Sequence, residues 1–185
     1  MLKLVSEPKT ATMSSRKTTL IFALLLLIPF MNSCGLFKST TKGNPTPIKN
    51  ETYSKAYTPD VIHKVVTTAR LFLGTPYQFG GTTQKGIDCS GLMTLAYNAA
   101  GLKIPRASYD IAKLGKDISL KQARKGDLLF FNTMNTGKIS HVGIVVSHKS
   151  DKEMIFVHAS NSGVNENNFY TPYYQKAFVK ATRPF

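Results

Sequence analysis

A chain of 185 residues with a formal net charge of +14 is long enough for one compact domain and an extension, and too short for two ordinary domains. Its hydrophobic content, with eleven Phe and eight Tyr, is that of a globular protein and argues against a disordered chain. The charge favours anionic partners, but the basic residues are spread thinly, without an Arg-rich run or a nucleic-acid motif, so we expect no nucleic-acid binding.

Residues 1–33 have the features of a secretory signal peptide. The basic pair Arg16-Lys17 precedes the apolar run 20–31. A run of this length is too short to span a bilayer, which takes about 20 residues. We therefore expect a cleaved leader and not a stable anchor helix.

The leader ends in Met31-Asn32-Ser33-Cys34-Gly35, which is similar to a bacterial lipobox. A small residue precedes a Cys that would become the lipidated amino terminus, so Cys34 is the expected lipidation site; an ordinary leader cleaved nearby is the alternative. Gly35 stands where Asp would favour retention in the inner membrane. We expect a lipid anchor in the outer membrane, facing the periplasm, and a polar tether broken by Pro and Gly over residues 34–57.

The folded domain is expected over residues 58–185, and its first half is predicted to be helical. Thr58-Pro59-Asp60 supplies an N-cap, a Pro at the first helical position and an acid in the first turn. Apolar residues then recur at helical spacing up to Gly74. A second helix is predicted from about Cys89 to Gly101, and a shorter helical piece over 109–114.

The second half changes to runs rich in β-branched and aromatic residues, which predict strands. These runs cover residues 127–131, 141–146, 154–159 and 178–182. Because helices come first and an antiparallel sheet second, the domain is predicted to be α+β.

Several short motifs follow one another in this domain. They are Gly74-Thr75-Pro76-Tyr77-Gln78-Phe79-Gly80-Gly81, Asp88-Cys89-Ser90-Gly91, Ser140-His141-Val142-Gly143-Ile144 and Val157-His158-Ala159-Ser160, with Arg124-Lys125-Gly126-Asp127-Leu128-Leu129-Phe130-Phe131 before the third. In this order and spacing, the sequence resembles the NlpC family of cell-wall cysteine endopeptidases over about residues 59–185. The resemblance implies a papain-like fold, with the nucleophile at a helix N-terminus and an antiparallel sheet packed behind it.

Cys89 is the predicted nucleophile. A thiol reacts as its thiolate, and a position at a helix N-terminus favours the negative charge and lowers the pKa of the thiol. Free backbone N–H groups at the same end can hold an oxyanion. A buried, inert thiol is the alternative interpretation.

His141 is the predicted general base, and it begins an apolar strand on which Gly143 leaves room beside the imidazole. If His141 faces the nucleophile, it takes the thiol proton and later protonates the leaving amine; a satisfied core histidine is the alternative. The resemblance places the group that orients His141 at His158. A turn at His148–Asp151 would set His141 directly opposite His158, with His148 as a less favoured competitor.

Four further residues are candidates for binding the substrate. By the resemblance, Tyr77 lines the cleft, where its hydroxyl can help hold an oxyanion; a packing role for its ring is the alternative. Asp88 and Ser90 flank the nucleophile and in the family face substrate, although Asp88 can also serve as a helix cap. Arg106 is a candidate for approaching a substrate carboxylate.

The four His and two Cys offer no paired-ligand spacing, so we expect no metal and no cofactor. The expected activity is that of a monomeric cell-wall hydrolase that cuts peptidoglycan stem peptides through a Cys89 thioester. The resemblance implies a cut between γ-D-glutamyl and a diamino acid, or in a D-alanyl crosslink to a diamino acid. A papain-like acyltransferase or amidase acting on a lipid or small molecule, and a non-catalytic lipoprotein that binds the wall, are the alternatives.

Overall fold

The structure, a computed structural model, describes residues 57–185. The expected signal peptide, the lipidation site Cys34 and the tether up to residue 56 lie outside the described residues. Within the described part, no helix has both the length and the apolar character needed to cross a membrane.

Helices form the first half of the domain, as the sequence predicts. α2 (Pro59–Arg70) begins after Thr58, whose extended backbone and side chain cap its first turn. α3 (Cys89–Ala99) is capped in the same way by Asp88. α4 (Ser108–Ile111) is shorter than the helical piece expected there.

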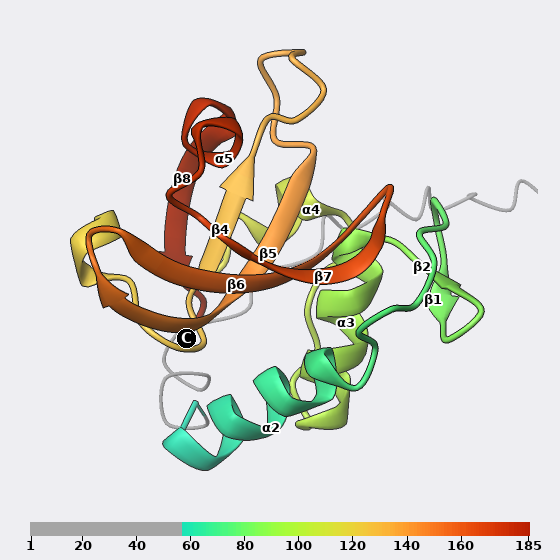
Figure 1. The fold of residues 1–185 in the computed structure, drawn as a ribbon. Helices are drawn as coiled ribbons and strands as arrows, with labels where there is room; N and C mark the ends of the chain where they lie inside the picture. Colours follow the sequence, from blue (N-terminus) through green and yellow to red (C-terminus); the bar gives the residue numbers. More distant parts are fainter. Residues whose placement is uncertain (1–56) are drawn as a thin grey trace, which may run out of the picture. The chain divides into compact units, whose positions relative to one another are not determined.

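Six strands form one antiparallel sheet in the order β3-β8-β4-β5-β6-β7, and β1 and β2 form a separate hairpin (Figure 1). The strands are β1 (Thr82–Thr83), β2 (Gly86–Ile87), β3 (Lys116–Ile118), β4 (Leu128–Phe131), β5 (His141–Ser150), β6 (Glu153–Ser160), β7 (Gly163–Asn168) and β8 (Phe178–Arg183). The four predicted strands correspond to β4, β5, β6 and β8. The sequence did not predict the other strands, the 3-10 turn Leu120–Gln122 or α5 (Pro172–Ala177).

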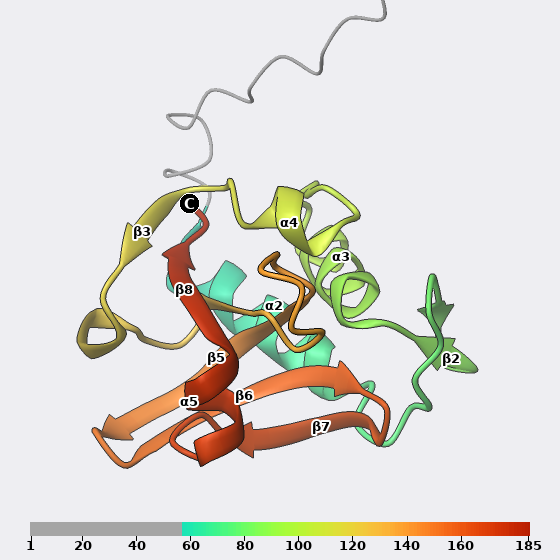
Figure 2. The same ribbon diagram turned by 90° about the horizontal axis from the view of Figure 1, so that it is seen from above.

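The sheet carries a hydrophobic core on each face. The first core joins α2 and α3 to the sheet through buried side chains that include Val65, Val66, Leu92, Met93, Leu128, Phe130, Val142, Ile144 and Val157. The second core, on the opposite face, includes Leu129, Phe131, Val145, Met154, Phe156, Phe169 and Ala181. Figure 2 shows α3 and the β1–β2 hairpin at one side of the domain and the edge strand β3 at the other, with other strands of the sheet between them.

The turn between β5 and β6 lies later in the chain than predicted. It was expected at His148–Asp151, but β5 continues to Ser150, which pairs with Glu153. The register of the two strands shifts twice before this point, once between Val145 and Ser147 and once between His148 and Ser150. His148, which the sequence placed in the turn, is part of β5. Its Nδ1 lies 2.8 Å from the carbonyl oxygen of Ala123, and this hydrogen bond gives the polar ring of this strand residue a partner.

Tyr57, the first described residue, is fixed at the end of the sheet where β4 begins. Its hydroxyl donates a hydrogen bond of 2.6 Å to the carbonyl oxygen of Gly126 and lies 3.2 Å from the hydroxyl of Tyr97. The ring of Phe185, the last residue, lies 5.2 Å from the ring of Tyr57. The two ends of the described domain therefore meet beside the start of β4.

Candidate active site

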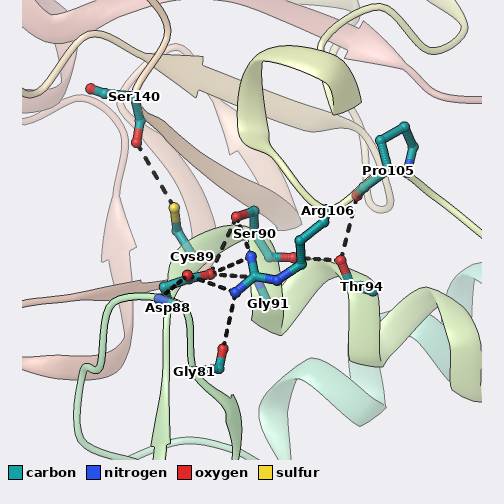
Figure 3. Close-up of polar contacts among 10 residues, drawn as sticks. Gly81, Asp88, Cys89, Ser90, Gly91, Thr94, Pro105, Arg106 and Ser140 are labelled. Carbon is teal, nitrogen blue, oxygen red and sulfur yellow. Dashed lines mark hydrogen bonds and ion pairs between the residues drawn. The ribbon is translucent and has the colours of Figure 1, made fainter. Parts of the chain in front are cut away.

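Cys89 is the first residue of α3, and its side chain is buried against the start of β5. Its Sγ lies 4.0 Å from the carbonyl oxygen of Ser140, the residue before His141 (Figure 3). The backbone amide of Val142, the residue after His141, also bonds the sulfur. The thiol is thus held against the backbone on both sides of His141.

The charge state of the isolated thiol differs from the expectation. Burial raises the pKa of Cys89 and is the largest effect. The hydrogen bond from the amide of Val142 lowers this pKa, and the negative charge of Asp88 raises it. The prediction of a lowered pKa at this helix end is therefore wrong for the thiol taken alone, because loss of solvation outweighs the favourable backbone amides. The group at rest is a neutral thiol.

His141 and His158 form a buried pair. His141 Nε2 lies 2.9 Å from His158 Nδ1, and the two rings meet edge to face with centroids 4.9 Å apart. Burial, together with His158, lowers the pKa of His141 to about 3, and burial also lowers the pKa of His158. Both imidazoles are therefore neutral at neutral pH.

The two histidines meet through a different register from the one predicted. Ile144 pairs with Val157, so His158 lies beside Gly143 and diagonal to His141. A methyl group at Gly143 would collide with the ring of Phe156 and lie 3.1 Å from Cβ of His158. The expectation that Gly143 makes room beside the imidazoles agrees with this packing, whereas the direct opposition of His141 and His158 was wrong.

Two residues that the sequence did not single out complete the surroundings of His158. Asn167 of β7 places Oδ1 2.8 Å from His158 Nε2, and Tyr174 of α5 places its hydroxyl 3.1 Å from the same nitrogen. The Tyr174 hydroxyl also donates to Asn167 Oδ1 at 3.2 Å. Thr171-Pro172, a helix-start pair, is the sequence signal that could have indicated α5.

Asp88 and Arg106 form an ion pair at the N-terminus of α3. The guanidinium contacts both carboxylate oxygens at 2.7 and 2.8 Å and the Ser90 hydroxyl at 2.7 Å (Figure 3). The backbone amides of Gly80 and Gly91 bond the same carboxylate at 2.7 and 2.6 Å. Burial alone would raise the pKa of Asp88, but Arg106 and these amides bring it below its ordinary value. The carboxylate is thus ionised and caps the helix.

A surface groove runs past these residues in two adjoining hollows that share Tyr77, Phe79 and Ser140. The first hollow contains Cys89, Asp88, Ser90 and Arg106, and the second contains His141 and His158. Tyr77 lies where the hollows meet. All seven residues predicted for catalysis or substrate binding therefore border one groove.

The described residues 57–185 contain no group of three or more His, Cys, Asp or Glu side chains placed to hold a metal ion. The groove offers a thiol, two neutral imidazoles, several tyrosine and serine hydroxyls and one ion pair. Such a set can carry out acyl transfer through a thioester.

Taken together, the helix with Cys89 at its N-terminus and the antiparallel sheet with His141 at the start of a strand define an α+β domain of the papain-like type. The family model described as the NlpC/P60 family matches residues 74–183. The chain belongs to the NlpC/P60 family.

Similar proteins are found among bacterial cell-wall enzymes. The chain is 36% identical over 126 residues to "Murein DD-endopeptidase MepS/Murein LD-carboxypeptidase" of Escherichia coli strain K12, which covers 67% of this chain and 63% of that protein. It is 45% identical over 83 residues to "Gamma-D-glutamyl-L-lysine dipeptidyl-peptidase" of Bacillus subtilis strain 168, covering 44% of this chain and 28% of that protein. The chain thus spans less than two thirds of either relative.

The fold is also similar to that of solved structures. The NlpC/p60 domain of the peptidoglycan hydrolase SagA superposes with a TM-score of 0.55 at 27% identity, over 66% of this chain and 97% of that domain. This likeness supports the papain-like α+β assignment.

Proposed function

We propose that the protein is a peptidoglycan endopeptidase that cuts amide bonds of stem peptides through a thioester on Cys89. The observation that carries the proposal is the position of Sγ, which contacts the backbone on both sides of His141 while the ring of His141 bonds His158. The names of the two bacterial relatives support peptidoglycan as the substrate.

The burial of both Cys89 and His141 bears on how a neutral thiol becomes a nucleophile. A charge on either group alone is unfavourable, because burial raises the pKa of the thiol and lowers that of the imidazole. Transfer of the proton from sulfur to His141 creates both charges together, and each stabilises the other in the low-dielectric groove. In this proposal, the proton transfer accompanies attack on the substrate and does not precede it.

The reaction then follows in two steps. The thiolate attacks the carbonyl carbon of the stem peptide, and His141 gives its proton to the leaving amine. Water, deprotonated by the now neutral His141, hydrolyses the thioester and releases the acid. His158 orients His141 in both steps through the 2.9 Å hydrogen bond.

The oxyanion of each step would lie at the N-terminus of α3, where backbone N–H groups are free to donate. Tyr77 is placed to add a donor. Burial raises the pKa of Tyr77, and the charge of an ionised Cys89 raises it further. The phenol therefore keeps its proton while the thiolate forms beside it.

The ion pair of Asp88 and Arg106 gives these two residues a proposed role that differs in part from the one expected. Arg106 fixes Asp88 and Ser90 through its hydrogen bonds, and because it also lines the groove, it remains a candidate for meeting a substrate carboxylate. Asp88 caps α3 and borders the groove, where its carboxylate is placed to meet a positively charged substrate amino group. The two bonds named for the relatives, a DD-crosslink and a γ-D-glutamyl bond, are the two candidate cleavage sites.

A lipid anchor at Cys34, in the outer membrane and facing the periplasm, is part of the same proposal. It is supported by the sequence Met31-Asn32-Ser33-Cys34-Gly35. An anchored monomer with a polar tether would act on the wall within reach of its membrane.

Digestion of purified peptidoglycan by the full-length protein in detergent tests the activity. Muropeptides identified by mass spectrometry should include new stem fragments that are absent with Cys89→Ala, and their masses name the bond. Thr94→Ala, a change in the same helix outside the groove lining, is the matched control and should cut normally. Intact peptidoglycan with a reactive Cys89 thiol would instead favour acyl transfer to or from a lipid, or wall binding without catalysis.

A further inference from the structure

The hydrogen bonds around His158 extend one residue further than a triad needs. His158 is fully buried, and its two ring nitrogens have different partners: Nδ1 bonds His141, whereas Nε2 lies within hydrogen-bond distance of Asn167 Oδ1 and of the Tyr174 hydroxyl. Asn167 comes from β7, an edge strand of the sheet. Its side chain is only half-buried, yet it bonds the fully buried ring of His158. This placement suggests a function in the catalytic chain of hydrogen bonds.

We propose that Asn167 is a positioning residue that sets the tautomer of His141 through His158. The inference rests on the proposed function, because it assigns no role unless His141 is the base for Cys89. Tyr174 holds the amide of Asn167 in the required orientation.

The argument follows the protons along the chain. The Oδ1 of Asn167 is an acceptor, so His158 Nε2 carries the proton of its neutral ring and donates it. His158 Nδ1 then has a lone pair and accepts from Nε2–H of His141. A neutral His141 with its proton on Nε2 has its lone pair on Nδ1, which is the nitrogen left to take the thiol proton.

The opposite orientation of the same amide reverses every step. If Nδ2 of Asn167 faced His158, it would donate to Nε2, and His158 would donate from Nδ1 to His141. His141 would then carry its proton on Nδ1 and could not accept one from Cys89. One amide thus selects between an active and an inactive arrangement.

Tyr174 supports the active orientation. Its hydroxyl donates its one proton to Asn167 Oδ1 at 3.2 Å, so a lone pair of the hydroxyl oxygen, 3.1 Å from His158 Nε2, is left to accept the proton of that nitrogen. The ring of Tyr174 is fixed by edge-to-face packing on Phe156, with centroids 4.9 Å apart. The helix α5 is therefore connected to His141 through three successive hydrogen bonds.

The histidine tautomers can be read directly by NMR of the 15N-histidine-labelled full-length protein at neutral pH, with His141→Gln and His158→Gln variants to assign the signals. In the wild type we expect a protonated Nε2 and a lone pair on Nδ1 for both rings. Asn167→Leu should produce a mixture of tautomers at His141 and a 10- to 100-fold lower kcat with little change in KM. Asn167→Asp keeps only acceptor oxygens and should retain the wild-type tautomers.

Glu166→Gln is the matched control, because Glu166 is the neighbour of Asn167 on the same strand, but its side chain lies on the other face of the sheet, where it pairs with Arg70. It should change neither the tautomers nor kcat. The inference is overturned if Asn167→Leu leaves His141 with a pure Nδ1 lone pair, or if the wild-type ring already carries its proton on Nδ1. If Asn167→Leu does not fold, a protonated His141 Nδ1 in Asn167→Asp overturns it as well.

The NMR readout needs no substrate, so it separates the two proposals. A wild-type protein that has the expected tautomers but leaves peptidoglycan intact supports the role of Asn167 and contradicts the proposed activity. A protein that cuts peptidoglycan with unchanged tautomers in Asn167→Leu does the reverse.

Discussion

Replacing Arg106 by Met removes the cation from a carboxylate that is almost completely buried. The side chain of Asp88 is 8% exposed and that of Arg106 is 41% exposed, so the pair lies at the boundary between protein and water. After the substitution, Asp88 keeps its bonds from the amides of Gly80 and Gly91 and loses both guanidinium contacts. Met retains most of the aliphatic packing of the Arg stem.

The expected loss of unfolding free energy at pH 7 is about 2 kcal/mol. Breaking a fully buried pair costs roughly 3–5 kcal/mol, and the exposed position of Arg106 reduces this value through solvent screening. Two remaining amide donors to Asp88 reduce it further.

The pH dependence identifies the carboxylate as the cause. In the wild type, Arg106 and the two amides lower the pKa of Asp88. The stability that this carboxylate contributes is therefore complete above its pKa in the unfolded chain, about 3.9, and is lost as the pH falls through its lower pKa in the folded protein. The variant protonates Asp88 at higher pH. The difference between the two proteins should therefore be largest above about pH 5 and shrink towards pH 3.

Urea denaturation of both proteins across this pH range measures the difference. Lys149→Met, which breaks the exposed pair with Glu153, is the control and should be indistinguishable from wild type. A loss for Arg106→Met that is the same at pH 7 and pH 3 would show that packing, and not the charge on Asp88, causes the effect. No loss at all would show that the amides alone stabilise the carboxylate.

Two further predictions concern the histidine pair. Gly143→Ala should lower kcat at least tenfold with a modest loss of stability, because the added methyl displaces Phe156 and His158. Steady-state kinetics and thermal unfolding measure the two effects, and an unchanged kcat would contradict the prediction. The buried, neutral His141 has a pKa lowered to about 3 against about 6.5 when unfolded, so stability should fall by roughly 2–4 kcal/mol as the pH decreases through this window. His141→Gln should flatten that slope in urea denaturation, and an equal slope in both proteins would place the titrating group elsewhere.

The two helices could be predicted because each carries its own local signals. Thr58 and Asp88 cap α2 and α3 in the structure, and a capped helix with an apolar face needs no information from distant residues. Cys89 and His141 were predicted as nucleophile and base from the order and spacing of the motifs around them, which resemble the family, and the structure places them at a helix start and a strand start.

The rest depended on contacts between distant segments. β7 reads Gly-Val-Asn-Glu-Asn-Asn, a polar run without alternation, and it forms a strand because β6 pairs with it over six residues. His148 remains in β5 because Ala123 and Tyr170, far away in sequence, surround its ring. Asn167 could not be recognised before β7 was known, since its role arises from the register with β6.

The contact between Tyr57 and Gly126 determines where the chain enters the domain relative to the groove that contains Cys89 and His141. β4 begins beside Gly126 and ends at Phe131, which pairs with His141, so the strand separates the entry of the chain from the groove by roughly 13 Å. Residue 57 therefore joins the domain at one end of β4, and the groove lies at the other end. A long polymer strand lying in the groove would meet the end of β4 that faces away from this point of entry.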